Sequence, residues 1–157
     1  MKNLLMVCLG NICRSPLAEG VLKEKLKRLN KEAFVDSAAV IAYHEGQNPD
    51  PRSTAIALKY GIDISTQTGR QIKPIDFETF HEIYAMDKHV YDQILMLAKT
   101  ETQKEKVILF METKYPGSGR EVPDPYYGGP EGFENVYRMI DEVCDIIAER
   151  VLVKQKP

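Results

Sequence analysis

The chain has 157 residues, and its 21 Lys and Arg residues nearly balance its 23 Asp and Glu residues, so the net charge at pH 7 is -2. A chain of this length fits a single domain over residues 1–157 with a hydrophobic core of its own. The near-neutral charge gives no broad attraction to nucleic acid or to a membrane surface. We therefore expect neither as a partner, and any anion site must be local.

The cysteines indicate a reducing environment. Cys8, Cys13 and Cys144 are too few and too scattered for the disulfide framework of a secreted protein or for a structural zinc site. The apolar run near the N-terminus is too short for a signal peptide, and no stretch approaches the roughly 20 apolar residues that cross a bilayer. We expect a cytoplasmic protein that needs no metal and no cofactor.

The first predicted element is a strand over residues 4–8, a short apolar run that stops at Gly10 and Asn11. A helix should follow, with Ser15 as its N-cap and Pro16 in its first position. Apolar residues then recur at helical spacing: Leu17, Val21, Leu22, Leu26 and Leu29. The sequence therefore opens as strand, turn and helix.

Strands and helices continue to alternate along the rest of the chain. Short apolar segments predict three more strands, over residues 34–36, 80–86 and 106–111. Helical composition predicts helices over residues 51–60 and 90–99, and a third after the Gly- and Pro-rich residues 116–132. One face of this last helix carries Phe133, Val136, Tyr137, Ile140, Val143, Cys144 and Ile147.

This alternation predicts an α/β fold with three layers, α/β/α, around a four-stranded, mainly parallel sheet of the Rossmann-like kind. In such sheets, ligands bind at the carboxyl ends of the strands. The turn over residues 8–15 follows the first strand, so we expect a phosphate-binding loop there.

The residues of this turn suit an oxyanion. A loop between a strand and a helix points backbone N–H groups at a common centre, and the helix N-terminus adds partial positive charge. Gly10 permits the tight backbone path. The N–H dipoles and a nearby cation favour the thiolate of Cys8, which makes it a candidate nucleophile. The planar guanidinium of Arg14 matches two phosphate oxygens, so the turn predicts phosphoryl transfer to sulfur.

Two motifs point to one family. Residues 8–16, C-L-G-N-I-C-R-S-P, form a C-x5-R-S signature, and D-P-Y-Y stands at residues 124–127. With both motifs the chain closely resembles the low-molecular-weight protein tyrosine phosphatase family over nearly its whole length. The resemblance implies a phosphoric monoester hydrolase that cleaves protein phosphotyrosine and small aryl phosphates through a cysteinyl-phosphate intermediate. Its ligands would be phosphotyrosyl proteins or peptides and inorganic phosphate or other oxyanions.

The resemblance also implies the roles of individual residues. Cys8 would attack phosphorus and Arg14 would stabilise the transferring phosphoryl group. Asp124 would protonate the leaving phenolic oxygen and then take a proton from the attacking water. Ser15 would bind the Cys8 thiolate, and Asn11 would hold the loop in shape through side-chain bonds, one of them to Ser37. The phosphate-binding loop comprises Leu9, Gly10, Asn11, Ile12, Cys13 and Ser15.

The resemblance further implies a cleft and a redox response. Tyr43 and Tyr126 would form the aromatic walls of the substrate cleft. Ile12 stands where the related arginine phosphatases are expected to carry threonine, which favours phosphotyrosine as substrate. Cys13 could capture an oxidised Cys8 as a disulfide before irreversible oxidation.

Two residues depart from the family pattern. Gln67 replaces a frequent histidine and His81 replaces a usual aspartate. Neither change touches the catalytic set, but both bear on the surrounding hydrogen bonds and the pH profile. His44, His81 and His89 have no metal-like spacing, and we interpret them as surface or structural residues.

Several alternative functions stay open at this point. A protein arginine phosphatase or an arsenate reductase would use a similar loop, although residues 70–100 contain no resolving cysteine for arsenate reduction. A phosphocarrier would not need Asp124 as an acid, and a phosphopeptide binder would not turn over.

Overall fold

The structure, a computed structural model, describes residues 1–153 of the chain. Its centre is a sheet with the strand order β2-β1-β3-β4, in which each neighbouring pair runs parallel. The strands are β1 (Lys2–Cys8), β2 (Ala33–Ala39), β3 (Glu82–Ala85) and β4 (Val107–Leu109). The predicted four-stranded parallel sheet is confirmed.

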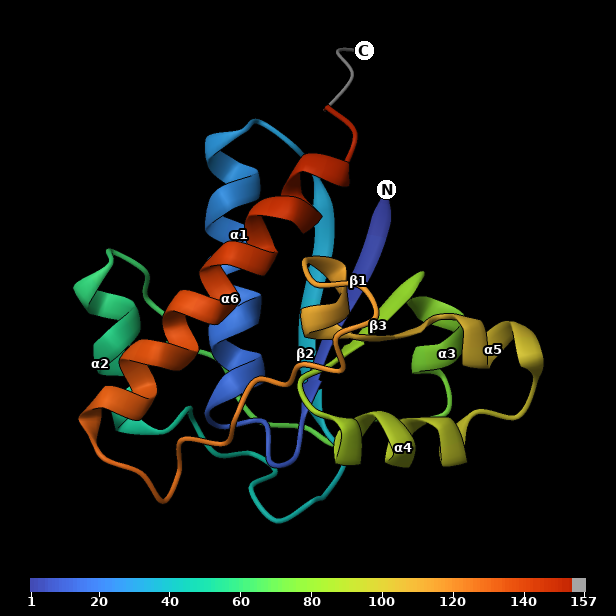
Figure 1. Cartoon of the computed structure of the whole chain (residues 1–157), viewed down its shortest axis with the longest axis horizontal. Helices are drawn as coiled ribbons and strands as arrows, with labels where there is room; N and C mark the ends of the chain where they lie inside the picture. The colour runs from blue at the N-terminus through green and yellow to red at the C-terminus, as the bar shows by residue number, and fades with distance from the viewer. Residues whose placement is uncertain (154–157) are drawn as a thin grey trace.

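Helices cover both faces of this sheet. The helices are α1 (Arg14–Arg28), α2 (Pro51–Lys59), α3 (Asp76–Thr79), α4 (Lys88–Leu97), α5 (Glu101–Glu105) and α6 (Pro130–Arg150), with a 3-10 turn, η1, at Phe110–Thr113. Figure 1 shows α1, α2 and α6 on one side of the strands and α3, α4 and α5 on the other. The predicted α/β/α layers are therefore present.

The alternation of side chains along β1 divides the core in two. Leu4, Met6 and Cys8 belong to a cluster with the apolar faces of α1 and α6. Leu5 and Val7 belong to a second cluster with residues of α3 and α4. Because residues 4–8 of β1 are buried on both faces, they form an unbroken apolar run, as expected for an inner strand of a parallel sheet.

The order of the strands places a switch point beside β1. The chain passes from β1 to the edge strand β2 and then returns to β3 on the other side of β1. Connections that leave in opposite directions open a crevice at the carboxyl ends of the two strands. Cys8 ends β1 and Asp87 follows β3, so both residues lie at this crevice.

The start of α1 corrects one sequence prediction. The helix begins at Arg14 with Cys13 in the N-cap position and no side-chain cap bond. Ser15 is therefore not the N-cap, because its hydroxyl lies beside the Cys8 sulfur instead. Leu29, expected on the buried stripe, is the C-cap and is 47% exposed.

Other element boundaries also differ from prediction. The helix expected over residues 90–99 begins earlier, because Asp87 caps α4 by accepting from Val90 N over 2.8 Å. A separate helix, α5, follows because Thr100 caps it by accepting from Gln103 N. The strand expected over residues 106–111 ends at Leu109, where η1 begins. Among residues 1–153, no helix has both the length and the apolarity to span a membrane.

Candidate active site

The loop between β1 and α1 folds around the sulfur of Cys8. Cys8 Sγ accepts a hydrogen bond from the backbone N of Asn11 over 3.3 Å and lies 3.0 Å from Ser15 Oγ. Asn11 has a φ of 57°, in the left-handed region that residues with a side chain rarely adopt and Asn tolerates best. Donors on the sulfur stabilise a thiolate, which is the form that acts as nucleophile.

A chain of side chains sets the direction of these hydrogen bonds. The amide Nδ2 of Asn11 donates to Ser15 Oγ over 2.7 Å and to Ser37 Oγ over 3.0 Å, so the bond predicted to Ser37 is present. Ser37 in turn donates to Glu19 Oε1 over 2.7 Å. Because Ser15 Oγ accepts from Asn11, its own proton can go to Cys8 Sγ at 3.0 Å or to the carbonyl O of Ala38 at 3.5 Å, and Cys8 is the nearer acceptor.

A residue from a distant segment holds Asn11 from the other side. The backbone N of Arg70 donates to Asn11 Oδ1 over 3.2 Å. The Arg70 side chain forms ion pairs of 3.0 Å with Asp36 and with Asp76. We had predicted no role for these two carboxylates, because Asn11 and Asp36 lie far from Arg70 in the chain.

Arg14 is buried behind the phosphate loop, with a side chain that is only 2% exposed. Its Nη1 donates to Asp87 Oδ2 over 2.6 Å and to the carbonyl O of Val122 over 2.9 Å. Burial alone would lower the pKa of Arg14, but the negative charges of Cys8, Asp87 and Asp124 outweigh burial and raise that pKa. The guanidinium therefore stays charged in this pocket.

Asp87 belongs to the site, although we did not predict it there. Its two oxygens have separate tasks, since Oδ1 caps α4 through Val90 N and Oδ2 binds Arg14. The signal was its position just after β3, because the carboxyl ends of neighbouring parallel strands meet at one edge of the sheet.

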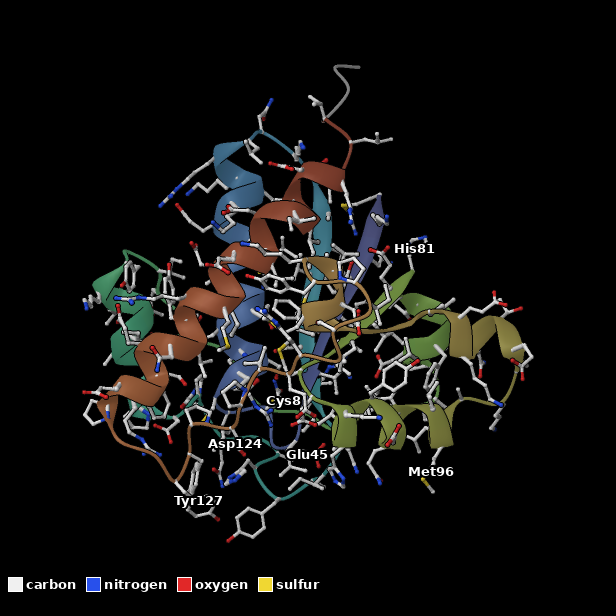
Figure 2. The ribbon with its side chains drawn as sticks, in the orientation of Figure 1. Cys8, Glu45, His81, Met96, Asp124 and Tyr127 are labelled. Atoms are coloured by element: carbon white, nitrogen blue, oxygen red, sulfur yellow. The ribbon has the colours of Figure 1, made fainter. Side chains whose placement is uncertain are left out.

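Asp124 reaches the site from the loop between η1 and α6 (Figure 2). Its Oδ2 lies 3.8 Å from Arg14 Nη2, and its Oδ1 accepts from the backbone N of Tyr126 over 3.0 Å. The side chain is 40% exposed, so it faces both the arginine and the solvent. This position suits a group that passes a proton to a leaving group at the mouth of a pocket.

Cys8, Arg14 and Asp124 line one cavity of about 300 Å³. Leu9, Gly10, Ile12 and Cys13 line it as well, as do Tyr43 and Tyr126. Asn11 and Ser15 do not line it, because they lie beneath the loop and hold it. A volume of this size fits a phosphorylated phenyl ring.

The cavity mouth holds residues that the sequence analysis missed. Ile41, His44 and Tyr127 also line the cavity, although we had interpreted His44 as a surface or structural residue. A Cβ at Gly10 would lie 2.9 Å from His44 Cδ2, so only glycine leaves room for the imidazole. Close approach of this ring, rather than a left-handed φ, is the reason for glycine at this position.

Cys13 is a buried free thiol, 5% exposed, close to Cys8 in the loop. Burial raises the pKa of Cys13 to about 12, and the nearby charges of Asp50 and Cys8 add to this effect. Cys13 is therefore a neutral thiol at neutral pH. The disulfide with Cys8 stays a prediction.

The two departures from the family pattern lie in different places. Gln67 Nε2 donates to the carbonyl O of Pro16 over 3.1 Å at the start of α1, while its buried Oε1 has no hydrogen-bond partner within residues 1–153. His81 Nδ1 accepts from Asn3 N over 2.9 Å at the far end of the sheet, well away from Cys8 in Figure 2. Only Gln67 is therefore close enough to influence the phosphate loop.

Comparisons with known proteins agree on one family. The family described as "Low molecular weight phosphotyrosine protein phosphatase" matches residues 3–156. The low molecular weight phosphotyrosine protein phosphatase of Schizosaccharomyces pombe is 40% identical over 136 residues, which cover 85% of this chain and 86% of that protein. A protein tyrosine phosphatase structure from Entamoeba histolytica matches with a TM-score of 0.86 at 36% identity, covering 94% of each chain. A structure of a Drosophila arginine phosphatase matches with a TM-score of 0.85 at 31% identity, covering 95% of this chain and 96% of that one.

Proposed function

The chain belongs to the low molecular weight phosphotyrosine protein phosphatase family and is a cysteine-based phosphatase, and on that premise we propose that Cys8, Arg14 and Asp124 carry its reaction. One observation carries this proposal. A sulfur with two hydrogen-bond partners, a buried guanidinium and a partly exposed carboxylate line the same cavity of about 300 Å³. These are the three groups that transfer of a phosphoryl group to sulfur requires.

In the first step, the Cys8 thiolate attacks phosphorus, so that an S–P bond forms and the P–O bond to the phenol breaks. Asp124 gives its proton to the departing phenolic oxygen. Asp87 and Val122 occupy Nη1 of Arg14, and within residues 1–153 Nε and Nη2 carry no hydrogen bond. That free edge of the guanidinium can bind two phosphoryl oxygens.

In the second step, water attacks the cysteinyl phosphate. The Asp124 carboxylate accepts a proton from this water, the S–P bond breaks, and the electron pair returns to the sulfur as thiolate. Ser15 donates to that sulfur and so stabilises the leaving thiolate. The products are inorganic phosphate and the starting enzyme, and neither step calls on a metal or a cofactor.

The cavity walls favour phosphotyrosine as substrate. Tyr43 and Tyr126 both line the cavity, and a phenyl ring packs well between aromatic side chains. Ile12 also lines the cavity and offers no hydrogen bond to a phosphorylated guanidinium. Phosphoarginine, which the name of the Drosophila protein suggests for that protein, is the second candidate substrate.

The proposal extends to the setting of the enzyme. We place it in the cytoplasm, because Cys8, Cys13 and Cys144 are free thiols, as is usual in a reducing compartment. We also propose a single domain over residues 1–157, because a chain of this length fits one domain. Its partners would be phosphotyrosyl proteins or peptides, with inorganic phosphate as product.

Hydrolysis of p-nitrophenyl phosphate in excess chelator tests the proposal. Wild type should turn over, Cys8→Ser should not, and the variant should still bind inorganic phosphate. Peptides with phosphotyrosine or phosphoarginine then identify the substrate, and we expect phosphotyrosine to be preferred. Absence of turnover by reduced wild type would contradict the phosphatase assignment, and preference for phosphoarginine would contradict the substrate.

A further inference from the structure

A second groove lies next to the catalytic cavity, between α2 and the start of α6. Its volume is about 460 Å³. Figure 1 shows α2 alongside the N-terminal part of α6. Its lining includes Arg52, Ala55, Ile56 and Lys59 of α2 with Pro130 and Phe133 of α6. The four α2 residues follow the spacing i, i+3, i+4 and i+7, so they form one face of that helix. We call this feature the α2–α6 groove.

The floor of the α2–α6 groove is continuous with the phosphate loop. Phe133 is 3% exposed and packs in one cluster with Ile12 and Cys13, against which Ile56 is packed. Ile12 and Cys13 also line the catalytic cavity. The same apolar cluster therefore underlies both hollows, and a ligand in one lies close to the other.

Arg52 contacts an aromatic ring of the catalytic cavity and an aromatic ring of the α2–α6 groove. Its guanidinium carbon lies 5.3 Å from the centre of the Tyr126 ring and 4.7 Å from the centre of the Phe133 ring. Asp50 fixes this orientation, since Arg52 Nε and Nη2 donate to the two Asp50 oxygens over 3.0 and 2.9 Å. The guanidinium therefore contacts one ring that lines the catalytic cavity, Tyr126, and one that lines the α2–α6 groove, Phe133.

The accessible charge at the rim of the α2–α6 groove is positive. The side chains of Arg52 and Lys59 are 45% and 62% exposed, whereas their carboxylate partners Asp50 and Glu134 are only 8% and 19% exposed. Within residues 1–153, Arg52 Nη1 donates no hydrogen bond. An apolar floor with cations above it is complementary to an apolar side chain next to an acidic one.

We propose that the α2–α6 groove binds the segment beside phosphotyrosine in a phosphopeptide substrate, with an apolar side chain on Phe133 and Ile56 and an acidic side chain at Arg52 or Lys59. Because the Arg52 guanidinium carbon lies 5.3 Å from the Tyr126 ring centre and 4.7 Å from the Phe133 ring centre, the two ring centres are at most about 10 Å apart, which about three residues of extended chain at about 3.3 Å each can span. The groove thus reads residues within three positions of the phosphotyrosine. This inference rests on the proposed function, because it takes the catalytic cavity as the phosphotyrosine site.

A positional scan of phosphopeptides tests the groove in the wild-type enzyme. Each peptide places one Leu at a different position, from three residues before to three after phosphotyrosine, in a Gly and Ser background with one Glu. We expect Leu at one of these positions to raise kcat/KM about tenfold over the peptide without Leu, because its apolar side chain is transferred from water into the α2–α6 groove. Equal kcat/KM values across the whole scan would overturn the proposal.

Ala55→Phe blocks the groove, and Leu58→Phe is its matched control. Ala55 lines the groove at an exposed position of α2, so a larger ring fills the hollow without disturbing the core. Leu58 is exposed on the same helix and does not line the groove. Ala55→Phe should remove the preference for Leu while hydrolysis of p-nitrophenyl phosphate stays unchanged, and Leu58→Phe should alter neither. An equal loss on peptide and on p-nitrophenyl phosphate would mean that the ring disturbs the catalytic site, and the proposal would fail.

Binding separates the failure of the groove from the failure of the catalytic assignment. Fluorescence anisotropy with Cys8→Ser measures peptide affinity without turnover, in the presence and absence of Ala55→Phe. A preference for Leu that Ala55→Phe removes would support the groove even if wild type proved inactive. Sedimentation of wild type and Ala55→Phe tests the other occupant, a second copy of the chain. Loss of a dimer in Ala55→Phe, with peptide binding unchanged, would assign the groove to that copy and overturn the proposal.

Discussion

Asn11 sets the direction in which the hydroxyl proton of Ser15 points. Its side-chain amide donates to Ser15 Oγ over 2.7 Å, which leaves the Ser15 proton for the Cys8 sulfur at 3.0 Å, a nearer acceptor than the carbonyl O of Ala38 at 3.5 Å. The same amide reaches Ser37, whose proton goes to the carboxylate of Glu19. An ionised carboxylate has no proton to donate and only accepts hydrogen bonds. Glu19 therefore sets the direction of each hydrogen bond from Ser37 through Asn11 and Ser15 to the Cys8 sulfur.

The first prediction separates these hydrogen bonds from the backbone conformation of Asn11. Asn11→Ala and Asn11→Gly both remove the amide that orients Ser15, and both should lower kcat for p-nitrophenyl phosphate by at least about tenfold, because Ser15 then no longer reliably donates to the Cys8 thiolate. Both variants should lose stability with the buried hydrogen bonds, but the φ of 57° suits Gly and strains Ala, so Asn11→Ala should lose about 1 kcal/mol more of unfolding free energy than Asn11→Gly. Urea denaturation measures that difference. Wild-type kcat in Asn11→Gly would show that the amide does not position Ser15.

The second prediction concerns Asp87, which accepts a hydrogen bond from Arg14 Nη1 over 2.6 Å. Asp87→Asn keeps a cap for α4, because Asn is as good an N-cap as Asp, but it removes the negative charge beside Arg14. We expect kcat/KM to fall about tenfold and inorganic phosphate to bind more weakly. The unfolding free energy should fall as well, because an Asn oxygen that keeps the cap turns the amide NH2 toward the buried Arg14. Asp87→Ala should lose about 1 kcal/mol of stability in addition, because the cap goes too. An unchanged phosphate affinity in Asp87→Asn would rule out this role.

Much of this site follows from local sequence. The apolar run of β1, the glycine after it and the spacing of Cys8 and Arg14 are properties of one short segment, and they predicted the strand, the loop and the anion site. The parallel sheet followed because strands alternate with helices along the chain.

The rest of the site depends on contacts between distant segments. Serine is a favoured N-cap residue, but the Ser15 hydroxyl instead contacts Cys8 because it also forms hydrogen bonds with Asn11 and with Ala38 at the end of β2. Asp87 and Val122 come to Arg14 only once β3 has paired with β1. No periodicity within one element encodes such contacts, so local patterns could not predict them.

The third prediction concerns the proton that Asp124 supplies. Asp124→Asn keeps the size of the side chain and its place in the turn with Tyr126, but it cannot give up a proton. The kcat/KM of the variant should therefore fall more steeply than that of wild type as the pKa of the leaving phenol rises. A series of substituted phenyl phosphates measures both slopes. Parallel slopes in the two enzymes would show that Asp124 is not the acid.

The last prediction concerns the rate at which Cys13 captures an oxidised Cys8. Burial raises the pKa of Cys13 to about 12, so only a small fraction is thiolate at neutral pH. In this capture, the Cys13 thiolate attacks the sulfur of a Cys8 sulfenic acid, the S–S bond forms and hydroxide leaves. Because a raised pKa means less thiolate at every pH below it, the rate should rise about tenfold from pH 7 to pH 8 and again from pH 8 to pH 9. To isolate this step, the enzyme is oxidised with one equivalent of peroxide at pH 6, the peroxide is removed by catalase, and the pH is then raised. Intact mass spectrometry follows disulfide formation as the loss of one water from the sulfenic acid form. Cys13→Ser is the control and should keep the sulfenic acid, whereas a rate independent of pH in wild type would mean that another group, rather than ionisation of Cys13, limits the capture.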